Sequence, residues 1–468
     1  MTPDSVLEAA VRELELSAAR VRRARPACEA AAGPARIVRE TAARHGTAAV
    51  VGLGHTGLPS ALALRRAGMR VLGIDTSPSR LREIRSGRAE LLDVRAEELR
   101  ERLADEDFVL GEEIEQAREA DWVLICVPAI LDAVRAPNLE ALRRACAAVV
   151  ECAHEGQTLV LASAGHVGAT RELLVAPLAR RGLRAGEEVH VACSPARIDA
   201  GVPEHDQLLT PRVVGAVSEA SYERAARLLA PISQRLQRVS SLEAAEMAKL
   251  YESAFRAVNV ALAFEIADAC RAQRLDAAEV TAAAASKPFG FMAHRASAGV
   301  GGHAVGVDPY HLLGPLRERG RGSPVLEGAM QTIAARPGLV AMRAHELLLR
   351  SGGRLRDARV LVVGAAYKPG VADCSGSPAV EIISWLAAED VRVDYHDPLV
   401  PVLRVDGEDM FTVDPDPRRD ASGFGPEDYE LAIVLTMQPG WDYGWLQRCP
   451  QVLDCTYGEP VGRAYELP

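Results

Sequence analysis

Three glycines and an aspartate have the types and the spacing that hold a dinucleotide cofactor. Gly52, Gly54 and Gly57 form a G-x-G-x-x-G pattern between the apolar run 48–51 and a helical pattern. The first glycine permits a tight turn, the second lets the backbone approach a pyrophosphate, and the third allows close packing of the helix, whose N-terminal N–H groups face the phosphates. Asp75 ends the next apolar run, at the spacing expected for a carboxylate that binds the adenosine ribose. Since a carboxylate there disfavours a 2′-phosphate, the sequence predicts NAD rather than NADP.

The segments that must position these residues alternate between apolar runs and amphipathic stretches from residue 47 onward. Such alternation is typical of βαβ units, which build a parallel sheet covered by helices on both faces. A helical region dominates 241–349, with its most continuous pattern at 245–273, and a second α/β segment begins at 359. The sequence therefore predicts the α/β class, with two Rossmann-like doubly wound domains bridged by a long central helix and a helical domain. The expected strands are 48–52, 71–74, 122–127, 158–162, 189–193, 359–364, 391–395 and 431–435.

Composition excludes several other classes of protein. The formal charge of -10 provides no basic excess, which argues against an unspecific nucleic-acid binder. Nine cysteines in 468 residues are too sparse for a disulfide scaffold, and Cys126 and Cys193 lie in apolar runs typical of reduced, buried thiols. Histidines and cysteines are dispersed, without C-x-x-C or H-E-x-x-H spacing, so no metal site is predicted. No apolar run of about 18 residues is present, and we expect a cytoplasmic protein with no membrane partner.

A series of motifs then gives the chain a resemblance to one family. From about residue 48 to residue 398 it resembles the UDP-glucose/GDP-mannose dehydrogenase family, especially its UDP-N-acetylhexosamine branch, and the motifs follow the family's order. Besides the glycine pattern they are Ile125-Cys126-Val127-Pro128, Ser194-Pro195-Ala196-Arg197, Thr210–Gly215, Glu246–Leu250, Phe255–Asn259, Lys287–Met292, Gly301–Tyr310, and Tyr367-Lys368-Pro369 followed by Asp373 and Ser377-Pro378.

The resemblance implies how the chain is divided and what it binds. It implies an NAD-binding Rossmann domain at 46–240, a central helical domain used for dimerisation at 241–349, and an α/β domain at 350–468 that helps hold the nucleotide half of the substrate. Ahead of them, 1–45 carries apolar positions at helical spacing and is expected to form a helical extension packed on the domain or on a second subunit. The expected partners are therefore a nucleotide sugar or nucleoside and a second copy of the chain.

The resemblance also assigns roles to individual residues. Lys249 and Asp308 match the family residues that stabilise the developing oxyanion and take part in proton transfer at the first hydride step, although an ion pair with Glu246 and a helix-starting aspartate are the simpler interpretations. His166 is a candidate replacement proton carrier, or a solvated loop histidine. The other expected site residues are Gly52, Gly54, Gly57, Asp75, Pro128 and Ser163 for the cofactor, and Asn259, Arg256, Gly301, Gly302, His303, Lys368 and Ser375 for the substrate.

The departures from the family pattern fall on residues that carry out the family's reaction. Ala304 stands where the family has its catalytic cysteine, Ala196 where it has a glutamate, and Ala164 where it has a threonine. Alanine has no lone pair or ionisable proton, so the thiohemiacetal and thioester of the family's second oxidation cannot form at Ala304. Ser375 replaces an arginine that can hold an anion bidentately, which points to a ligand other than an ordinary UDP-sugar. Further replacements are Ala129, Ala162 and Ser253.

These losses divide the expected chemistry. Hydride transfer needs a positioned nicotinamide, a charge partner for the alkoxide and a proton route, and Lys249 and Asp308 can serve the last two. The sequence therefore predicts an NAD-dependent two-electron oxidoreductase that forms an aldehyde or a ketone, or an epimerase that oxidises transiently, acting on a nucleotide sugar or a nucleoside-like substrate. Two alternatives stay open: a non-catalytic protein that binds NAD or a nucleotide, and an acid-forming dehydrogenase without a cysteine mechanism. Cys374 is considered as a relocated nucleophile, but an inert thiol is the simpler interpretation.

Overall fold

The computed structural model describes residues 36–37, 46–87, 94, 96–132, 135–199, 201–202, 205, 207–350, 355–415, 425–457 and 465–466. Within the predicted N-terminal helical extension, Arg36–Ile37 form strand β1, which pairs antiparallel with β11 (Arg235–Arg238). The sequence prediction of helix is therefore wrong at these two residues, because sheet pairing decides their conformation. The rest of the extension lies outside the described residues.

The N-terminal lobe is built on a nine-stranded sheet with the order β1-β11-β10-β9-β8-β5-β2-β3-β4. Its strands from β4 to β9 in this order are parallel, as the alternating pattern predicts, whereas β10 is antiparallel to β9. The bounds are β2 (Thr47–Val51), β3 (Arg70–Ile74), β4 (Phe108–Gly111), β5 (Trp122–Ile125), β8 (Thr158–Leu161), β9 (His190–Cys193) and β10 (Arg212–Ala216).

Helices cover both faces of this sheet, which explains its continuous apolar strands. In β2, Ala48 and Val50 belong to one core, shared with α2 and α7, while Ala49 and Val51 belong to the other, shared with α5 and α6. Successive side chains of a strand point to opposite faces, so a strand buried on both sides must be apolar throughout. The helices are α2 (Gly57–Arg66), α3 (Pro78–Arg85), α4 (Ala96–Leu103), α5 (Glu140–Cys152), α6 (Ala176–Arg180) and α7 (Glu219–Leu229), with the one-turn helices η2 (Ile114–Glu119) and η3 (Arg171–Val175) and the ribbon of β6 (Ile130–Leu131) and β7 (Pro137–Asn138).

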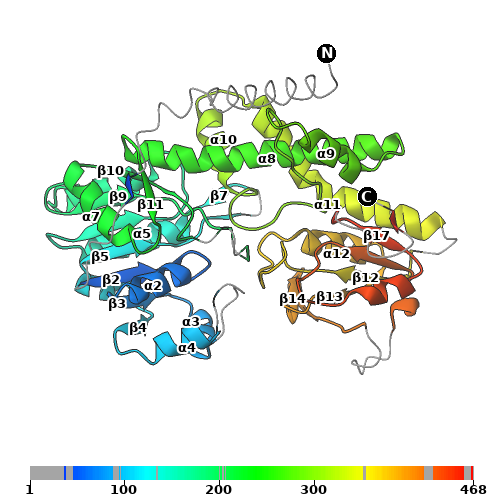
Figure 1. Cartoon of the computed structure of the whole chain (residues 1–468), viewed down its shortest axis with the longest axis horizontal. Coiled ribbons are helices and arrows are strands. Elements are labelled where there is room, and N and C mark those ends of the chain that lie inside the picture. Colours follow the sequence, from blue (N-terminus) through cyan, green and yellow to red (C-terminus); the bar gives the residue numbers. More distant parts are fainter. Residues whose placement is uncertain are drawn as a thin grey trace, which may run out of the picture.

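Two long helices connect this lobe to the C-terminal lobe (Figure 1). Helix α8 (Leu242–Ala272) begins at Ser241, whose side chain accepts a hydrogen bond from the Ala244 N–H, and it packs along α11 (Pro324–Arg350). Buried Arg336 on α11 donates to Asp268 of α8 at 2.8 Å and to the Ser297 carbonyl at 3.1 Å. The central region thereby fixes the chain that leads into the loop 301–308. The shorter helices here are α9 (Ala277–Ala285) and α10 (Asp308–Glu318).

The C-terminal lobe is a five-stranded parallel sheet with the order β13-β12-β16-β17-β18. It confirms the second α/β segment expected from the apolar runs, and with the first sheet it confirms the predicted fold class. The bounds are β12 (Arg359–Val363), α12 (Pro378–Ala388), β13 (Arg392–His396), β16 (Leu431–Val434), β17 (Val452–Asp454) and β18 (Tyr465–Glu466), with the hairpin β14 (Val402–Val405) and β15 (Glu408–Phe411) and the short helices η5 (Pro426–Asp428) and η6 (Gly444–Arg448).

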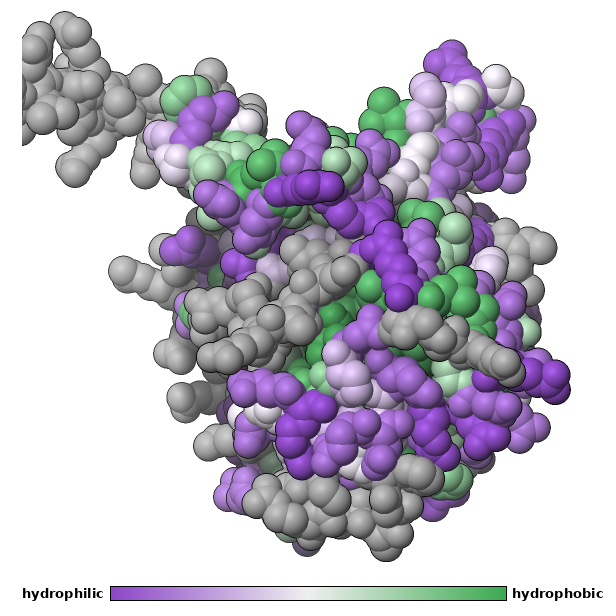
Figure 2. Space-filling view, turned by 90° about the vertical axis from the view of Figure 1, so that its right-hand side faces the viewer, coloured by the Kyte–Doolittle hydropathy of each residue, from purple (hydrophilic) through white to green (hydrophobic). Residues whose placement is uncertain are grey.

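The surface of the C-terminal side is mainly polar, with apolar residues reaching it in a few patches (Figure 2). None of the helices in the described part of the chain is long and apolar enough to cross a bilayer. Cys126 and Cys193 are buried free thiols, as predicted. Across the described ranges, no group of three or more histidine, cysteine, aspartate or glutamate side chains is placed to hold a metal ion.

Candidate active site

A cleft of about 660 Å³ lies where both lobes meet the central region. Its N-terminal wall consists of the loops that follow β2, β3, β5 and β8, at residues 52–56, 75–77, 126–129 and 162–164. Its other wall comes from α8, from the loop 301–308 and from residues 367–375 of the C-terminal lobe. Ligands of open parallel sheets bind beyond the carboxyl ends of the strands, so the topology places the cleft where a nucleotide cofactor is expected.

The glycine loop has the backbone shape that a pyrophosphate requires. Gly52 has a φ of +90°, a conformation that residues with a side chain rarely adopt. A side chain on Gly57 would place its Cβ 1.7 Å from the Gly52 carbonyl oxygen, so helix α2 can begin this close to the turn only with glycine there. A Cβ on Gly54 would meet no atom within 4 Å, and this residue lines the cleft. The loop therefore leaves a bare backbone surface at the start of α2, where helix N–H groups attract phosphate.

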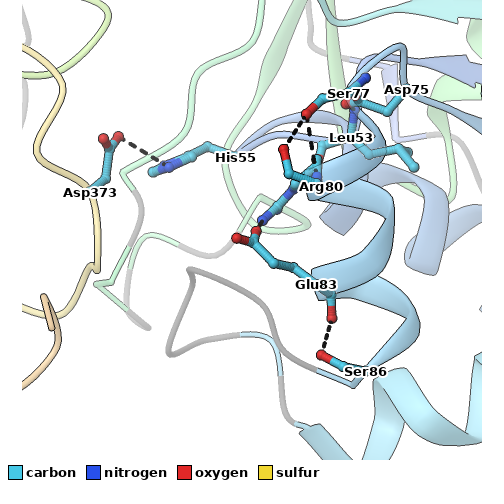
Figure 3. A network of polar contacts seen from close by, with 9 residues as sticks. Leu53, His55, Asp75, Ser77, Arg80, Glu83, Ser86 and Asp373 are labelled. Atoms are coloured by element: carbon cyan, nitrogen blue, oxygen red, sulfur yellow. Dashed lines mark hydrogen bonds and ion pairs between the residues drawn. The ribbon is translucent and has the colours of Figure 1, made fainter. Parts of the chain in front are cut away.

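Asp75 is held at the rim of this loop in the geometry expected of a ribose-binding carboxylate (Figure 3). Its Oδ2 accepts a hydrogen bond from the Leu53 N–H at 2.8 Å, and its Oδ1 accepts one from the Ser77 N–H at 2.9 Å. Arg80 donates to the Leu53 carbonyl at 3.0 Å, so both the N–H and the carbonyl of Leu53 are hydrogen-bonded. Each carboxylate oxygen has a second lone pair, which leaves acceptors for two ribose hydroxyls. The residues present thus fit NAD.

Lys249 and Asp308 meet in the cleft, although 59 positions separate them in sequence. The Lys249 Nζ lies 3.9 Å from Asp308 Oδ2, and the Ser253 hydroxyl donates to the same oxygen at 2.6 Å. Asp308 is completely buried, and its Oδ1 has no hydrogen-bond partner within the described part of the chain. Burial raises the pKa of Asp308, and the Lys249 charge and the Ser253 hydrogen bond offset only part of that effect. The pair therefore combines a cation with a carboxyl group poised to exchange a proton.

The backbone of the loop before Asp308 packs directly on the C-terminal lobe. The Gly302 N–H donates to the Ser375 carbonyl at 2.7 Å. A Cβ on Gly301 would lie 2.6 Å from the Tyr367 Cβ, and one on Gly302 would lie 2.8 Å from the Tyr367 ring. Both glycines are therefore needed for this close approach, which joins the active-site loop to residues 367–376.

Asp373 carries the polar contacts of the same junction. Its Oδ2 lies 3.2 Å from Nε2 of His55 in the glycine loop and 3.4 Å from Nε2 of His303 in the active-site loop. Its Oδ1 accepts the Ser375 N–H at 2.8 Å. Burial favours the protonated acid, but the close contacts with His303, His55 and Ser375 prevail and lower the pKa of Asp373 well below its usual range. The group is therefore a carboxylate at any working pH.

The cleft has several small lining side chains and few thiols near it. Among the described residues, the cleft is lined by one cysteine, Cys126, which is buried, and burial raises its thiol pKa to about 12. Cys374 does not line the cleft, and burial likewise raises its pKa to about 12. Neither thiol is a thiolate near neutral pH, and thiolate is the form that attacks a carbonyl. The alanines that line the cleft are Ala129, Ala141, Ala145, Ala162, Ala164, Ala196 and Ala304.

The cleft brings together most of the residues predicted to form the site. Gly57 lies behind the turn rather than in the cleft. Asn259 donates to the Phe255 carbonyl within α8, and His166 pairs with Glu172 at 2.9 Å; neither lines the cleft. The predicted residues that line it are Gly52, Gly54, Asp75, Pro128, Ser163, Lys249, Arg256, Gly301, Gly302, His303, Asp308, Lys368 and Ser375.

Sequence reasoning missed several residues of the cleft. His55 is not among the predicted site residues, yet it contacts Asp373 of the other lobe. Asp199 receives a hydrogen bond from Lys368 at 2.5 Å, so the lysine expected to bind substrate is partly neutralised. Glu246 accepts from the Thr170 N–H at 2.7 Å and is buried, and it supports a loop rather than pairing with Lys249. The signal in the sequence is that His55 directly follows Gly54, inside the glycine pattern that lines the cofactor site.

His311, on α10 directly behind Asp308, gives a test of the packing around the site. Burial, with a smaller effect of the His166 charge, lowers the pKa of His311 to about 4 from its usual 6.5. A histidine whose folded-state pKa is depressed loses stability as pH falls from the unfolded value toward the folded one, because the unfolded chain binds the proton more tightly. We expect this group to remove about 2 kcal/mol of stability between pH 7 and pH 5. Urea unfolding should show a smaller change over this range for His311→Gln than for the exposed control His154→Gln; equal changes would contradict the assignment.

Three family models match the chain in sequence order. They are the NAD binding domain of the UDP-glucose/GDP-mannose dehydrogenase family over residues 47–233, its central domain over 243–333, and its UDP binding domain over 361–447. The matched NAD binding domain includes the glycine loop and Asp75. NAD is therefore the cofactor.

Relatives and solved structures agree with these matches. The chain is 29% identical to a UDP-N-acetyl-D-glucosamine 6-dehydrogenase of Pseudomonas aeruginosa over 354 residues, which is 75% of this chain and 82% of the relative. It is 29% identical to a UDP-N-acetyl-D-mannosamine dehydrogenase of Pyrococcus horikoshii over 353 residues, 75% and 83% of the two chains. The structure of the UDP-D-ManNAc dehydrogenase of Pyrococcus horikoshii superimposes with a TM-score of 0.77 at 26% identity, covering 89% of this chain and 98% of that one. In fold, sequence and cofactor domain, this oxidoreductase belongs to the UDP-glucose/GDP-mannose dehydrogenase family.

Proposed function

We propose that the protein is an NAD-dependent two-electron oxidoreductase that acts on a nucleotide sugar or a nucleoside-like alcohol. It forms an aldehyde or a ketone, or it oxidises transiently and returns an epimer. The observation that carries this proposal is the pairing of Lys249 with buried Asp308 in a cleft that Ala304 also lines. The match to the family's UDP binding domain over 361–447 supports a nucleotide as part of the substrate.

The side chains of the cleft fit the first oxidation. Bound NAD supplies a nicotinamide that accepts a hydride. The Lys249 ammonium, 18% exposed and flanked by Asp308, provides positive charge for the oxygen that becomes an alkoxide. Asp308, whose pKa is raised by burial, lies 3.9 Å from that ammonium and helps to hold it in the cleft. Ser253 donates to Asp308 Oδ2, while Oδ1 has no hydrogen-bond partner among the described residues.

The same cleft does not fit the family's second oxidation. Acid formation through a thioester needs a thiolate next to the aldehyde, and Ala304 occupies the position that the resemblance gives to the cysteine. Cys126, the cysteine among the described lining residues, is buried and has its pKa raised to about 12. These features favour a reaction that stops after two electrons over acid formation by a relocated cysteine.

The decisive experiment combines mass spectrometry with NADH absorbance for a panel of nucleotide sugars and nucleosides plus NAD. We expect a product lighter by two hydrogens and one NADH per product, or an isomer without net NADH if the carbonyl is reduced again. Two NADH per product and a carboxylate would instead support the acid-forming alternative. Tight NAD binding without any turnover would support the non-catalytic alternative.

We also propose that the protein is a homodimer formed along α8. Five large apolar side chains with exposed surface lie along this helix at spacings of four or seven residues, which places them on one face. They are Met247, Tyr251, Phe255, Leu262 and Ile266, with exposed fractions of 41–70%. Light scattering of the eluting protein should give about twice the chain mass of 50.1 kDa; a monomer would refute the proposal.

A further inference from the structure

His55 and His303 both contact the carboxylate of Asp373, and the proposed reaction does not use this contact. Three segments meet at this point: the glycine loop of the N-terminal lobe, the active-site loop, and the C-terminal lobe loop that carries Asp373 (Figure 3 shows His55 and Asp373). The two imidazole rings are 5.9 Å apart and nearly perpendicular, and both line the cleft. Such an arrangement fixes the orientation of each ring.

We propose that His303, oriented by Asp373, accepts the hydroxyl proton of the alcohol during its oxidation. This inference rests on the proposed function and deepens it. The O–H bond of the alcohol breaks, and its electron pair forms the second bond of the carbonyl. The proton moves to Nδ1 of His303. The hydride leaves the carbon for the nicotinamide that bound NAD would supply. His303 later releases the proton to water. Lys249 remains the charge partner of the oxygen.

The tautomer of His303 follows from its partner. Asp373 is ionised and accepts hydrogen bonds only, so the neutral imidazole keeps its proton on Nε2, which faces the carboxylate at 3.4 Å. Nδ1 then carries the free lone pair that a general base needs. A carboxylate that holds a histidine in one tautomer and stabilises the imidazolium formed later is the arrangement of a catalytic acid–base pair.

Solvent exposure distinguishes His303 from Asp308, the other candidate for the general base in the cleft. Asp308 is fully buried and close to Lys249, so a proton placed there has no direct way to water. His303 is 35% exposed and adjoins Ala304, the position at which the family resemblance places the reacting centre. The Asp373 Oδ2 has no well-aligned hydrogen bond, and catalytic hydrogen bonds of this kind commonly tighten when substrate binds.

The titratable neighbours do not compete for this role near neutral pH. Tyr367 and Cys374 face Asp373, and burial raises the pKa of each to about 12. Asp199 is paired with Lys368, and Arg256, which lines the same cleft, offers hydrogen-bond donors only. His55 shares the carboxylate but belongs to the glycine loop, so we assign it to positioning the cofactor side of the cleft.

The first test needs no substrate. The full chain is labelled with ¹⁵N in its histidine rings, saturated with NAD, and examined by long-range ¹H–¹⁵N correlation, with His303→Gln used to assign the signal. We expect a single Nε2–H tautomer for His303 and a mixture of tautomers in Asp373→Asn. An unchanged tautomer in Asp373→Asn would overturn the role of Asp373.

The second test uses the alcohol identified by the panel. His303→Gln retains a donor toward Asp373 but removes the base, so kcat should fall by about 100-fold or more and the acidic limb of the pH–kcat/KM profile should disappear. Asp373→Asn should lower kcat by a smaller factor than His303→Gln, because the base remains but its tautomer is no longer fixed. His154→Gln, an exposed histidine outside the cleft, is the matched control.

The remaining outcomes distinguish this inference from simpler ones. Equal effects of His55→Gln and His303→Gln on KM, with an unchanged pH profile, would show that the cluster only joins the lobes and would overturn the inference. An active His303→Gln enzyme with the wild-type pH profile would do the same while leaving the proposed function intact. Absence of hydride transfer from every alcohol would refute the proposed function and the base role together, and the tautomer experiment would still decide whether Asp373 orients His303.

Discussion

Replacement of Lys249 by alanine is expected to lower the rate of product formation by about 10²–10³-fold, the usual effect of removing one charge that stabilises an oxyanion. The Lys249 Nζ lies 3.9 Å from the buried Asp308 carboxyl, and Lys249 lines the same cleft as Asp75. The loss should therefore appear in kcat, measured by NADH absorbance or by the amount of isomer formed. NAD affinity, measured by calorimetry, should remain close to that of the wild type.

The control for this variant is Arg271→Ala, which removes an exposed cation from the other end of the same helix. Its turnover should match the wild type. Unchanged turnover in Lys249→Ala would remove the lysine from the mechanism, and loss of NAD binding would show that the substitution had disturbed the cofactor half instead. Because Lys249 also stabilises the ionised form of Asp308, the variant should raise the pKa of Asp308 further.

Replacement of Gly57 by alanine is expected to weaken NAD binding by about 100-fold, a loss equivalent to about 3 kcal/mol or one to two charge-assisted hydrogen bonds. The added Cβ would lie 1.7 Å from the Gly52 carbonyl oxygen, so the turn or the start of α2 must move. Either movement takes the helix N–H groups away from the pyrophosphate. Calorimetric titration with NAD measures the loss directly.

Gly328→Ala is the matched control for Gly57→Ala. Gly328 lies inside α11, where a Cβ would meet no atom within 4 Å, and alanine is favoured over glycine in a helix interior by about 1 kcal/mol. This variant should bind NAD normally and melt at the same temperature or higher. Normal NAD binding by a folded Gly57→Ala protein would contradict the role given to the third glycine.

Much of the fold could be predicted from the sequence, because its signals are local. The continuous apolar runs at 48–52, 158–162 and 359–364 identify strands that are buried on both faces, and the structure has strands at each. Strands β4, β10, β11, β14, β15 and β17 were among those not predicted. Strand β11 has the sequence Arg-Leu-Gln-Arg, whose place in a sheet depends on pairing with β10 and β1 rather than on its own apolar pattern.

The sequence by itself determined the cofactor loop and its aspartate, since G-x-G-x-x-G followed by Asp75 describes one turn, one helix start and one strand end. Resemblance singled out Lys249 and Asp308 as well. Only the tertiary structure brought these two side chains to 3.9 Å and removed His166 from the cleft. Only the tertiary structure joined His55 and His303 to Asp373, because the three belong to different lobes and loops. The physical reason is that a polar contact between distant segments leaves no periodic trace in the chain, and its geometry exists only after both lobes have packed against the central helices.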